Sequence, residues 1–446
     1  MAETELTDQY ESWGRLPKAR HRVRRVDWRI CENPFAQDDS PVLSYGLGRS
    51  YGDSCLNDGG VLLITHGLNR FISFDAQTGL LRCEAGVTLA EILELITPRG
   101  WFLPVTPGTK YVTMGGAIAN DVHGKNHHHA GTFGRFITQF ELLRSTGERL
   151  MCSPTQNPEW YRATIGGLGL TGLILWAEIQ LKPIHNPFIQ METIRFANLD
   201  GFFELSADSD HDYEYTVSWI DCLAQGRDLG RGLFMRGNHA APQLVGPVPA
   251  TPHRKVTMPF NAPDFVLNTA SLKTFNWLFY HKQRRERVEQ LEHYEPFFYP
   301  LDAILHWNRL YGRRGFFQYQ CVVPYRGNES SIRRILEMIA AAGMGSFLAV
   351  LKVFGDMPSP GLMSFPKPGV TLALDFPNKG RPLLRLFERL DKIVRDNGGA
   401  VYPAKDARMS AANFQAFFPQ WREFAAYLDP QFSSGFWRRV TTPPKN

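Results

Sequence analysis

Residues 44–53 read SYGLGRSYGD, a loop with glycines at positions 46, 48 and 52 that follows a short apolar run. The spacing is one residue longer than the dinucleotide fingerprint, and no G-K-[ST] triplet follows, which excludes a P-loop. Glycines allow successive backbone N–H groups to approach an anion, and Arg49 adds a fixed positive charge. The stretch therefore predicts either an anion site or a tight turn with a surface arginine.

Two more glycine-rich loops follow, at residues 104–121 (PVTPGTKYVTMGGAIAND) and 164–173 (TIGGLGLTGL). Apolar runs rich in Val, Ile, Leu and Thr separate the loops and predict strands from position 42 to about 182. Residues 88–100 predict a helix, since Thr88 and Glu91 have the spacing of a capping box, and residues 157–167 predict a shorter one. Three such loops in one α+β domain predict one extended ligand held mostly by main chain, and a dinucleotide fits that description.

The composition changes after Pro183, where glycine becomes rarer and aromatic residues increase. Residues 315–324 (GFFQYQCVVP) alternate as a strand with two glutamines on one face, and residues 369–377 predict another strand. Residues 330–343 and 381–399 predict amphipathic helices closed by glycine. This half predicts an α/β domain on a largely antiparallel sheet. The proline-rich residues 238–270 predict a long loop or lid.

The whole chain has 446 residues, 43% of them hydrophobic, which is enough for two domains. Its net charge of +5 is small and excludes a dedicated nucleic-acid binder with a basic face. Six cysteines without a C-x-x-C pair predict free thiols in a reducing compartment. The acidic N-terminus and the lack of a long apolar run predict a soluble, cytoplasmic protein, compatible with attachment to a membrane surface.

Residues 123–131 (HGKNHHHAG) gather four histidines and raise the alternative of a zinc-dependent hydrolase. Zinc sites commonly pair histidines at helical spacing. Here the neighbouring glycines argue against a helix, and successive residues point in different directions. We therefore expect no metal. We interpret His123 and Lys125 as part of the wall of the dinucleotide pocket, and the other three histidines as residues behind it or at the surface.

The same loops, with the motifs LDAILHWNRLYGRRGFFQYQ (301–320), MSFPKPG (363–369) and YPAKDAR (402–408), make the chain similar to a known family. They resemble the flavoprotein subunits of decaprenylphosphoryl-β-D-ribose 2′-epimerase, which are FAD oxidases of the vanillyl-alcohol-oxidase superfamily. The resemblance runs in order from about residue 12 to beyond residue 430. GRSYGD is widespread in the superfamily, whereas HGKNHH, FFQYQ and YPAKDAR point to the narrower family.

The resemblance implies an FAD-binding domain of the p-cresol-methylhydroxylase type made of residues 1–186 and 400–446, with a substrate domain of residues 187–399 between them. The first loop lacks the histidine that binds flavin covalently in many superfamily members, so we expect non-covalent FAD. The implied FAD contacts are Ser44, Tyr45, Gly46, Leu47, Gly48, Arg49, Ser50, Tyr51, Gly52, Asp53, Ser54, Gly108, Thr113, Met114, Gly115, Gly116, His123, Gly124, Lys125, Asn126, Ile174 and Tyr402.

The implied reaction is oxidation of the 2′-hydroxyl of a polyprenyl-phosphoryl-β-D-ribose to the 2-keto sugar, which a separate short-chain reductase converts to the arabinose. A desolvated lysine can act as a base or stabilise an anion. The implied catalytic residues are Lys405, Lys125, Gln320, Tyr51 and His123, and the implied substrate contacts are Gln318, Gln320, Trp219, Thr371, Phe298 and Lys405. From the residues alone, each also fits an ordinary role in the core or at the surface.

The chain departs from the family where substrate would lie. Thr371 and Ala373 stand in place of Asn and Cys, and Phe298 in place of a common tyrosine. These departures keep open an oxidase or dehydrogenase of a soluble sugar, alditol or aldonolactone. Residues 238–285 place aromatic side chains beside basic ones, and the basic ones include His253, Arg254 and Lys255. This pattern predicts contact with an anionic membrane surface, with a buried helix as the alternative.

Overall fold

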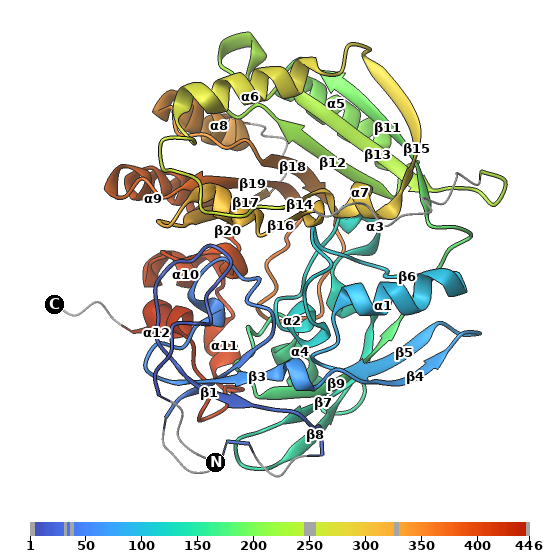
Figure 1. The fold of residues 1–446 in the computed structure, drawn as a ribbon, viewed down its shortest axis with the longest axis vertical. Coiled ribbons are helices and arrows are strands. Elements are labelled where there is room, and N and C mark those ends of the chain that lie inside the picture. Colours follow the sequence, from blue (N-terminus) through green and yellow to red (C-terminus); the bar gives the residue numbers. More distant parts are fainter. Residues whose placement is uncertain (1–4, 31–33, 36–39, 245–255, 325–329, 443–446) are drawn as a thin grey trace.

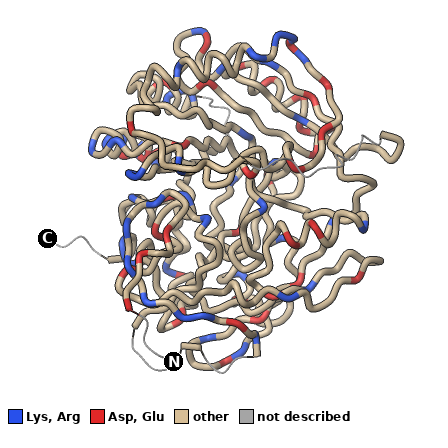
Figure 2. The backbone as a smooth tube through the Cα atoms, in the orientation of Figure 1, with Lys and Arg blue, Asp and Glu red and all other residues tan. Residues whose placement is uncertain are grey.

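The computed structural model describes residues 5–30, 34–35, 40–244, 256–324 and 330–442. They form two lobes, and the upper lobe in Figure 1 contains the largest sheet. The mixture of helices and strands confirms the α+β class. Lys and Arg are interspersed with Asp and Glu over both lobes (Figure 2). Within the described residues, no helix combines the length and apolarity that a membrane crossing needs.

The lower lobe contains two main sheets. A parallel sheet has the order β1 (Arg22–Arg25), β3 (Val61–Ile64), β2 (Val42–Tyr45). An antiparallel sheet has the order β4 (Phe71–Asp75), β5 (Leu80–Glu84), β9 (Leu173–Gln180), β7 (Ile137–Leu143), β8 (Arg149–Cys152). Strand β6 (Trp101–Phe102) pairs with β10 (Lys182–Pro183). The strands expected in this half are confirmed.

The α-helices of the lower lobe are short: α1 (Leu89–Ile96), α2 (Met114–Ala119), α3 (His127–Ala130), α4 (Pro158–Thr164), α10 (Ala411–Phe417), α11 (Trp421–Ala425) and α12 (Gly435–Thr441). The capping box of α1 is present, because Thr88 Oγ1 accepts from the Glu91 N–H and the Glu91 carboxylate accepts from the Thr88 N–H. Helices α1 and α4 confirm the two helices predicted here.

Helix α3 contradicts the expectation that glycines keep the histidine cluster out of a helix. The Asn126 carbonyl accepts from the N–H groups of His129 and Ala130, at 3.0 and 2.8 Å, and so closes one turn. Gly131 then ends the turn with a φ of +71°. The glycines limit the length of this helix but do not prevent it.

The upper lobe is an eight-stranded sheet with the order β15 (Arg287–His293), β11 (Phe188–Phe196), β13 (Gly232–His239), β12 (Tyr215–Ile220), β18 (Ala349–Phe354), β19 (Gly369–Pro377), β17 (Phe316–Pro324), β20 (Ala400–Val401). Every neighbouring pair is antiparallel, which confirms the expected sheet. Its helices are α5 (Leu199–Ser209), α6 (Thr269–His281), α7 (Tyr294–Phe298), α8 (Ser330–Ala342) and α9 (Arg381–Asp396).

Short elements complete the structure. A parallel ribbon joins β14 (Val256–Thr257) to β16 (Ile304–Leu305). The 3-10 helices are η1 (Asp53–Cys55), η2 (Thr65–Gly67), η3 (Thr97–Arg99), η4 (Phe133–Phe136), η5 (Gly226–Asp228), η6 (Pro300–Ala303), η7 (Trp307–Tyr311) and η8 (Pro403–Lys405). Part of the predicted loop at 238–270 lies outside the described residues, as do Cys31, His253, Arg254 and Lys255. The other five cysteines are free thiols.

Alternation along β17 and β19 decides which side chains face the lower lobe. Tyr319 of β17 stacks on Phe387 of α9, with 5.3 Å between ring centroids, so this face of the sheet is the helix-covered one. Gln318 and Gln320 therefore point to the other face. Gln320 lies opposite Ala373 in the register, which adds β19 to the same surface.

The chain crosses back to the lower lobe directly after β20. Ala400 and Val401 still pair with β17, and the Tyr402 hydroxyl then donates to the Asn120 carbonyl at 2.8 Å. Helices α10 to α12 lie in the lower lobe (Figure 1), where the Gly435 N–H at the start of α12 donates to the Leu56 carbonyl at 2.7 Å. The boundaries at 186/187 and 399/400 stay predictions.

Candidate active site

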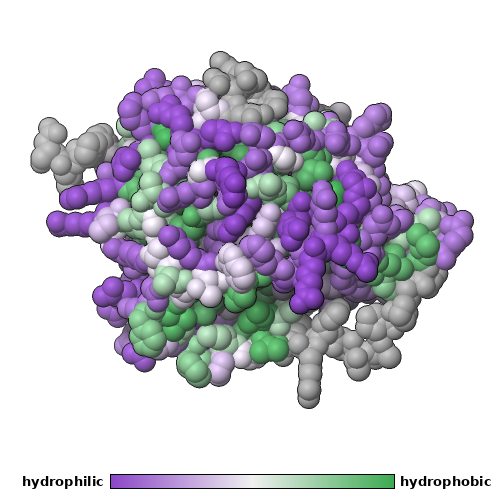
Figure 3. Space-filling model, turned by 90° about the horizontal axis from the view of Figure 1, so that it is seen from above, coloured by the Kyte–Doolittle hydropathy of each residue, from purple (hydrophilic) through white to green (hydrophobic). Residues whose placement is uncertain are grey.

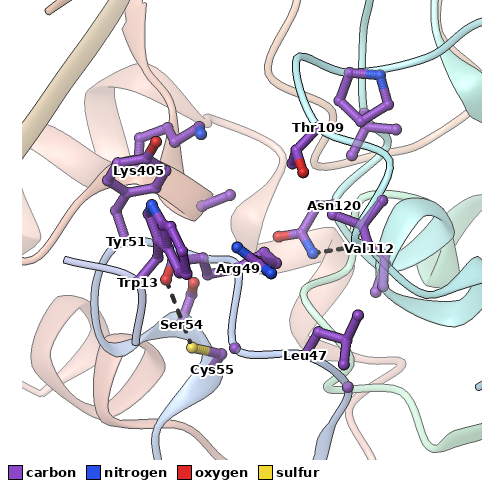
Figure 4. Close-up of a pocket in the computed structure, with 18 of the residues that line it drawn as sticks. Trp13, Leu47, Arg49, Tyr51, Ser54, Cys55, Thr109, Val112, Asn120 and Lys405 are labelled. Atoms are coloured by element: carbon purple, nitrogen blue, oxygen red, sulfur yellow. Dashed lines mark hydrogen bonds between the residues drawn. The ribbon is translucent and has the colours of Figure 1, made fainter. Parts of the chain in front are cut away.

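One cavity lies between the lobes, and all three glycine loops reach it. From the implied FAD contacts its lining includes Ser44, Gly46, Leu47, Gly48, Arg49, Ser50, Tyr51, Ser54, Gly108, Thr113, Gly115, Gly116, His123, Ile174 and Tyr402. The upper sheet adds Gln318, Gln320, Val350, Lys352, Thr371 and Ala373, and η8 adds Lys405. Figure 4 shows Tyr51 and Lys405 on one side of this space and Thr109, Val112 and Asn120 on the other, with Arg49 between them.

The first glycine loop is fixed by its neighbours and leaves its own amides available. The Tyr51 N–H donates to the Ala404 carbonyl and the Ser50 carbonyl accepts from Trp13, both at 2.8 Å. Gly48 has a φ of +60°, and a Cβ there would lie 2.0 Å from the Tyr45 hydroxyl. The N–H groups of residues 46–50 donate to no other group within the described part of the chain. A loop of this kind fits a pyrophosphate.

The cavity also has room and unsatisfied polar atoms where an FAD molecule would lie. A Cβ added at Gly108 or Gly169, both in the lining, would meet no atom within 4 Å. The Ser44 and Ser54 hydroxyls and the Arg49 Nε are buried without a partner among the described residues. These groups fit a large polar ligand contacted by main chain and small side chains.

Two half-buried lysines face the cavity. The Lys405 Nζ lies 3.9 Å from the centroid of the Tyr51 ring, and the Lys352 Nζ donates to the Gly124 carbonyl at 3.2 Å. Burial lowers the pKa of Lys405 to about 8. Burial, together with the charges of Lys125 and Lys405, lowers the pKa of Lys352 to about 7. One of the two can therefore be neutral near pH 7 while the other keeps its charge.

Asp375 lies behind this pair on β19. Its carboxylate accepts from the Gln318 side-chain amide, and its Oδ2 has no partner within the described residues. Burial raises the pKa of Asp375 to about 7, although Gln318 and Lys405 oppose the shift. The carboxylate in turn favours the charged form of Lys405. Asp375 thus orients one glutamine and adjusts the charge of one lysine.

His123 and Gln320 connect the lobes. The Gln320 Nε2 donates to the His123 Nε2 at 2.9 Å and also lies 3.4 Å from the Thr371 hydroxyl. Burial, then the charge of Lys352, holds the pKa of His123 well below its usual range. His123 is therefore neutral, with its proton on Nδ1, which has no acceptor among the described residues. That N–H can donate to a ligand.

Several residues expected at the site lie outside the cavity lining: Tyr45, Gly52, Asp53, Met114, Gly124, Lys125, Asn126, Trp219 and Phe298. The Lys125 Nζ lies 5.6 Å from the Phe297 ring centroid, and burial lowers the pKa of Lys125 to about 8. Trp219 donates its indole N–H to the Phe347 carbonyl at 2.9 Å. Phe298 packs against Tyr215, with ring centroids 4.8 Å apart. Asp406, next to Lys405 in the chain, caps the turn at Met409 and pairs with Arg439.

Four further residues line the cavity and were not predicted from the sequence: Lys352, Asp302, Trp13 and Trp307. Lys352 had a readable signal, because it is a charged residue at an inward position of the apolar strand AVLKVF (349–354). Trp13 and Trp307 are brought together from distant segments, with ring centroids 5.6 Å apart, and nothing in the sequence pairs them.

The histidine cluster does not converge on one point. The His127 ring packs on Phe354, with centroids 4.3 Å apart, while His128 Nε2 lies 2.9 Å from the Tyr213 carbonyl. His129 is exposed. Over the described ranges, no group of three or more His, Cys, Asp or Glu is placed to hold a metal ion. His123, in contrast, belongs to the cavity.

Comparison with known proteins shows the family of this chain. Residues 33–153 match the FAD binding domain family. The chain is 36% identical to decaprenylphosphoryl-β-D-ribose oxidase of Mycolicibacterium smegmatis, over 90% of this chain and 89% of the relative. It is 33% identical to an uncharacterised protein of Streptomyces coelicolor, over 79% of this chain and all of the relative. It is 29% identical to L-gulonolactone oxidase of Scyliorhinus torazame, over 34% of each chain.

Proposed function

Because this chain belongs to the family of FAD-dependent oxidases that contains decaprenylphosphoryl-β-D-ribose oxidase, we propose that it oxidises the 2′-hydroxyl of a polyprenyl-phosphoryl-β-D-ribose to the 2-keto sugar. The observation that carries the proposal is the juxtaposition in one cavity of the glycine loops with Gln320, Lys352 and Lys405. The oxidation is the first half of an epimerisation of the ribose to the arabinose.

Bound FAD supplies the acceptor for the hydride that leaves the carbinol carbon. The residues of this chain have three tasks: to hold the sugar, to take the hydroxyl proton and to balance charge. Gln318 and Gln320 present amide groups for the sugar hydroxyls. The first glycine loop binds the pyrophosphate non-covalently through its free amides.

The two lysines divide the remaining work. Lys352, with a pKa of about 7, is the group that is neutral near pH 7 and accepts the hydroxyl proton. Lys405 stays charged beside Asp375 and stabilises negative charge as it develops on the substrate and cofactor. Tyr51 and neutral His123 form the wall between them and provide hydrogen-bonding and packing surface.

A soluble sugar or aldonolactone is the second candidate substrate. Two observations favour it: Thr371 and Ala373 line the cavity where the family has Asn and Cys, and a lactone oxidase is among the relatives. Ala373 is smaller than the Cys of the family and therefore leaves more space beside Gln320, which lies opposite it in the sheet. A lipid-linked sugar, in contrast, also needs groups outside the cavity that accept its phosphate and its prenyl chain.

We further propose a cytoplasmic enzyme that contacts the inner face of the membrane and passes its product to a short-chain reductase. Helix α6 supports the membrane contact, because Phe275, Trp277 and Leu278 are 42%, 52% and 55% exposed beside its basic end. Seen from above (Figure 3), the upper lobe is largely hydrophilic, with hydrophobic side chains gathered toward the lower border of the view. A keto sugar also needs a reductant to complete the epimerisation.

Anaerobic mixing of the FAD-loaded protein with candidate substrates tests the function. We expect a short-chain prenyl-phosphoryl-β-D-ribose to bleach the visible flavin absorption, while free ribose, alditols and aldonolactones do so at least about 100-fold more slowly. Equal bleaching by free sugars would favour the second candidate, and no bleaching by any of them would refute both.

A further inference from the structure

Three arginines and one histidine lie on or beside the segments that carry Trp13 and Trp307 of the cavity wall. We call them the cation cluster: Arg15, Arg49, His306 and Arg309. We propose that the cation cluster binds the phosphodiester of the lipid-linked sugar, and that the exposed apolar residues next to it hold the first part of the prenyl chain. This assignment rests on the proposed function and names the part of the protein that would read the phosphate.

The cluster is joined to the cavity through Arg49. Arg49 lines the cavity, and its guanidinium lies over the Trp13 ring at 4.1 Å from the centroid. Trp13 packs edge-on against Trp307, which also lines the cavity and directly follows His306. Arg49 therefore connects the first glycine loop, where FAD is expected, to the cation cluster.

Residues 258–261 bind the side chains of both Arg15 and Arg309. Arg309 Nη1 donates to the Met258 and Pro259 carbonyls, at 2.9 and 3.2 Å. Arg15 Nη1 donates to Asn261 Oδ1 at 2.6 Å. Each guanidinium uses only part of its donors in these bonds, so both are positioned before any ligand binds.

The charge of the cluster is not balanced by protein carboxylates. The Arg309 N–H donates to the His306 carbonyl at 2.9 Å and Arg15 Nη1 donates to the Gly312 carbonyl at 3.3 Å, so these three residues meet at η7. Burial, then the charges of Arg309, Arg49 and Arg15, lower the pKa of His306. The acidic groups nearby are Glu11, 3.9 Å from Arg15, and Asp302, which interacts with Arg49. Arg309 makes no ion pair with any described residue. Three fixed positive charges face two carboxylates, and an anionic ligand would balance the remainder.

Apolar residues continue outward from the cluster. Val256 of β14 and Ile304 of β16 are 63% and 41% exposed, and Phe260, directly after the Pro259 that Arg309 holds, is 66% exposed. The Met258 N–H donates to the Leu305 carbonyl at 3.0 Å, which ties the two strands together beside Arg309. From the cavity outward, the surface is therefore polar, then cationic, then apolar. A prenyl-phosphoryl sugar has the same order of sugar, phosphate and hydrocarbon.

The Arg309→Gln variant tests the proposal, with flavin reduction measured for a short prenyl-phosphoryl-β-D-ribose and for the matching prenyl riboside without phosphate. We expect KM for the phosphorylated substrate to rise about tenfold, as for loss of one charge-assisted hydrogen bond, with kcat within about twofold. KM for the phosphate-free riboside should not change. Arg227→Gln, at a side chain that is 96% exposed in another part of the lobe, is the matched control.

The outcomes separate this proposal from the function it rests on. Failure of the native protein to oxidise either prenyl substrate would refute the function. Turnover with an unchanged KM in Arg309→Gln, or an equal change for both substrates, would overturn the phosphate assignment alone. Inhibition of the native protein by inorganic phosphate that Arg309→Gln loses, without any change in KM for the lipid substrate, would show a free-phosphate site and also overturn it. Bound-FAD content monitors folding, and Arg15→Gln repeats the test if Arg309→Gln does not fold.

Discussion

Lys352 receives its proposed role from its position rather than from its residue type. It lies on a strand otherwise made of apolar residues, and burial, together with the charges of Lys125 and Lys405, lowers its pKa to about 7. A lysine acts as a base only when neutral, so activity should rise as pH rises through this value. Replacing Lys352 with Met should lower kcat at least about 100-fold and remove that acid limb.

The pH profile of flavin reduction in native protein and Lys352→Met checks this assignment. FAD content should be unchanged, because Lys352 comes from the upper sheet and not from a glycine loop. A variant that is slow but keeps the same acid limb would show that another group titrates, and would assign the base elsewhere.

Asp375 gives a second prediction, which concerns the alkaline limb of activity instead of the acid limb. Its carboxylate raises the pKa of Lys405, so Asp375→Asn should lower that pKa below about 8. Lys405 then loses its charge at lower pH, and the alkaline decline of activity should begin earlier. The alkaline limb of kcat measures the effect. An unmoved limb with a general loss of activity would mean that Asp375 only holds Gln318.

At the residue scale, the sequence located the glycine loops and part of the sugar side of the lining but missed Lys352 and Asp302. The glycines, Gln318, Gln320 and Lys405 could be predicted because their motifs are contiguous. Trp219 lies beyond the lining even though it faces Val350 across β12 and β18, because α6 packs Phe279 against it at 4.6 Å. Such displacements depend on tertiary packing, which alternation along a strand does not report.

Among the elements, the second glycine loop should be sensitive to any side chain that enters the cavity. A Cβ at Gly108 meets no protein atom within 4 Å, so Gly108→Val should fold normally and lose FAD affinity. The ratio of flavin to protein after purification, with unfolding temperature as the second readout, tests this. Gly201→Ala in α5, where a Cβ makes ordinary contacts, is the control. Full flavin content in Gly108→Val would place the cofactor away from this loop.

Asp121 joins the segment between β18 and β19 to the lower lobe. Its buried carboxylate accepts from the Gly134 N–H at 2.8 Å, from the Ser364 hydroxyl at 2.5 Å and from the Ser359 hydroxyl. Its φ of +39° is tolerated by Asn, so Asp121→Asn removes acceptors without straining the backbone.

We expect Asp121→Asn to cost about 1–3 kcal/mol of unfolding free energy and to lower Tm by several degrees. Thermal unfolding of the variant beside Asp208→Asn, at an exposed position of α5, measures the difference. Equal Tm values for the two variants would show that this connection does not stabilise the lobes.

For whole elements, the local sequence was a reliable guide. The helices at residues 88–100 and 381–399 and the strands β17 and β19 form where capping, period and glycine punctuation predict them. The single turn α3 was not foreseen, because its closure depends on one carbonyl, that of Asn126, and on no periodic signal. The pairing of β14 with β16 across about 50 residues likewise has no local signal.

At the scale of the molecule, the cavity exists because the two lobes meet. The lower lobe contributes the glycine loops and the upper sheet contributes the glutamines and Lys352, so neither lobe alone would hold cofactor and sugar together. The glycine loops, then the two lysines and then the cation cluster follow one another along the cavity. We assign one lipid-linked sugar as the substrate because its parts have a matching order.

The most direct test of this account measures flavin reduction with prenyl-phosphoryl-β-D-ribose carrying deuterium at C2 or at C3 of the sugar. If the cavity presents the C2 carbinol to the cofactor, anaerobic reduction should slow by about 1 kcal/mol of barrier, several-fold, with C2 deuterium and be unchanged with C3 deuterium. A slowing only with C3 deuterium, or no reduction by either compound, would contradict the account.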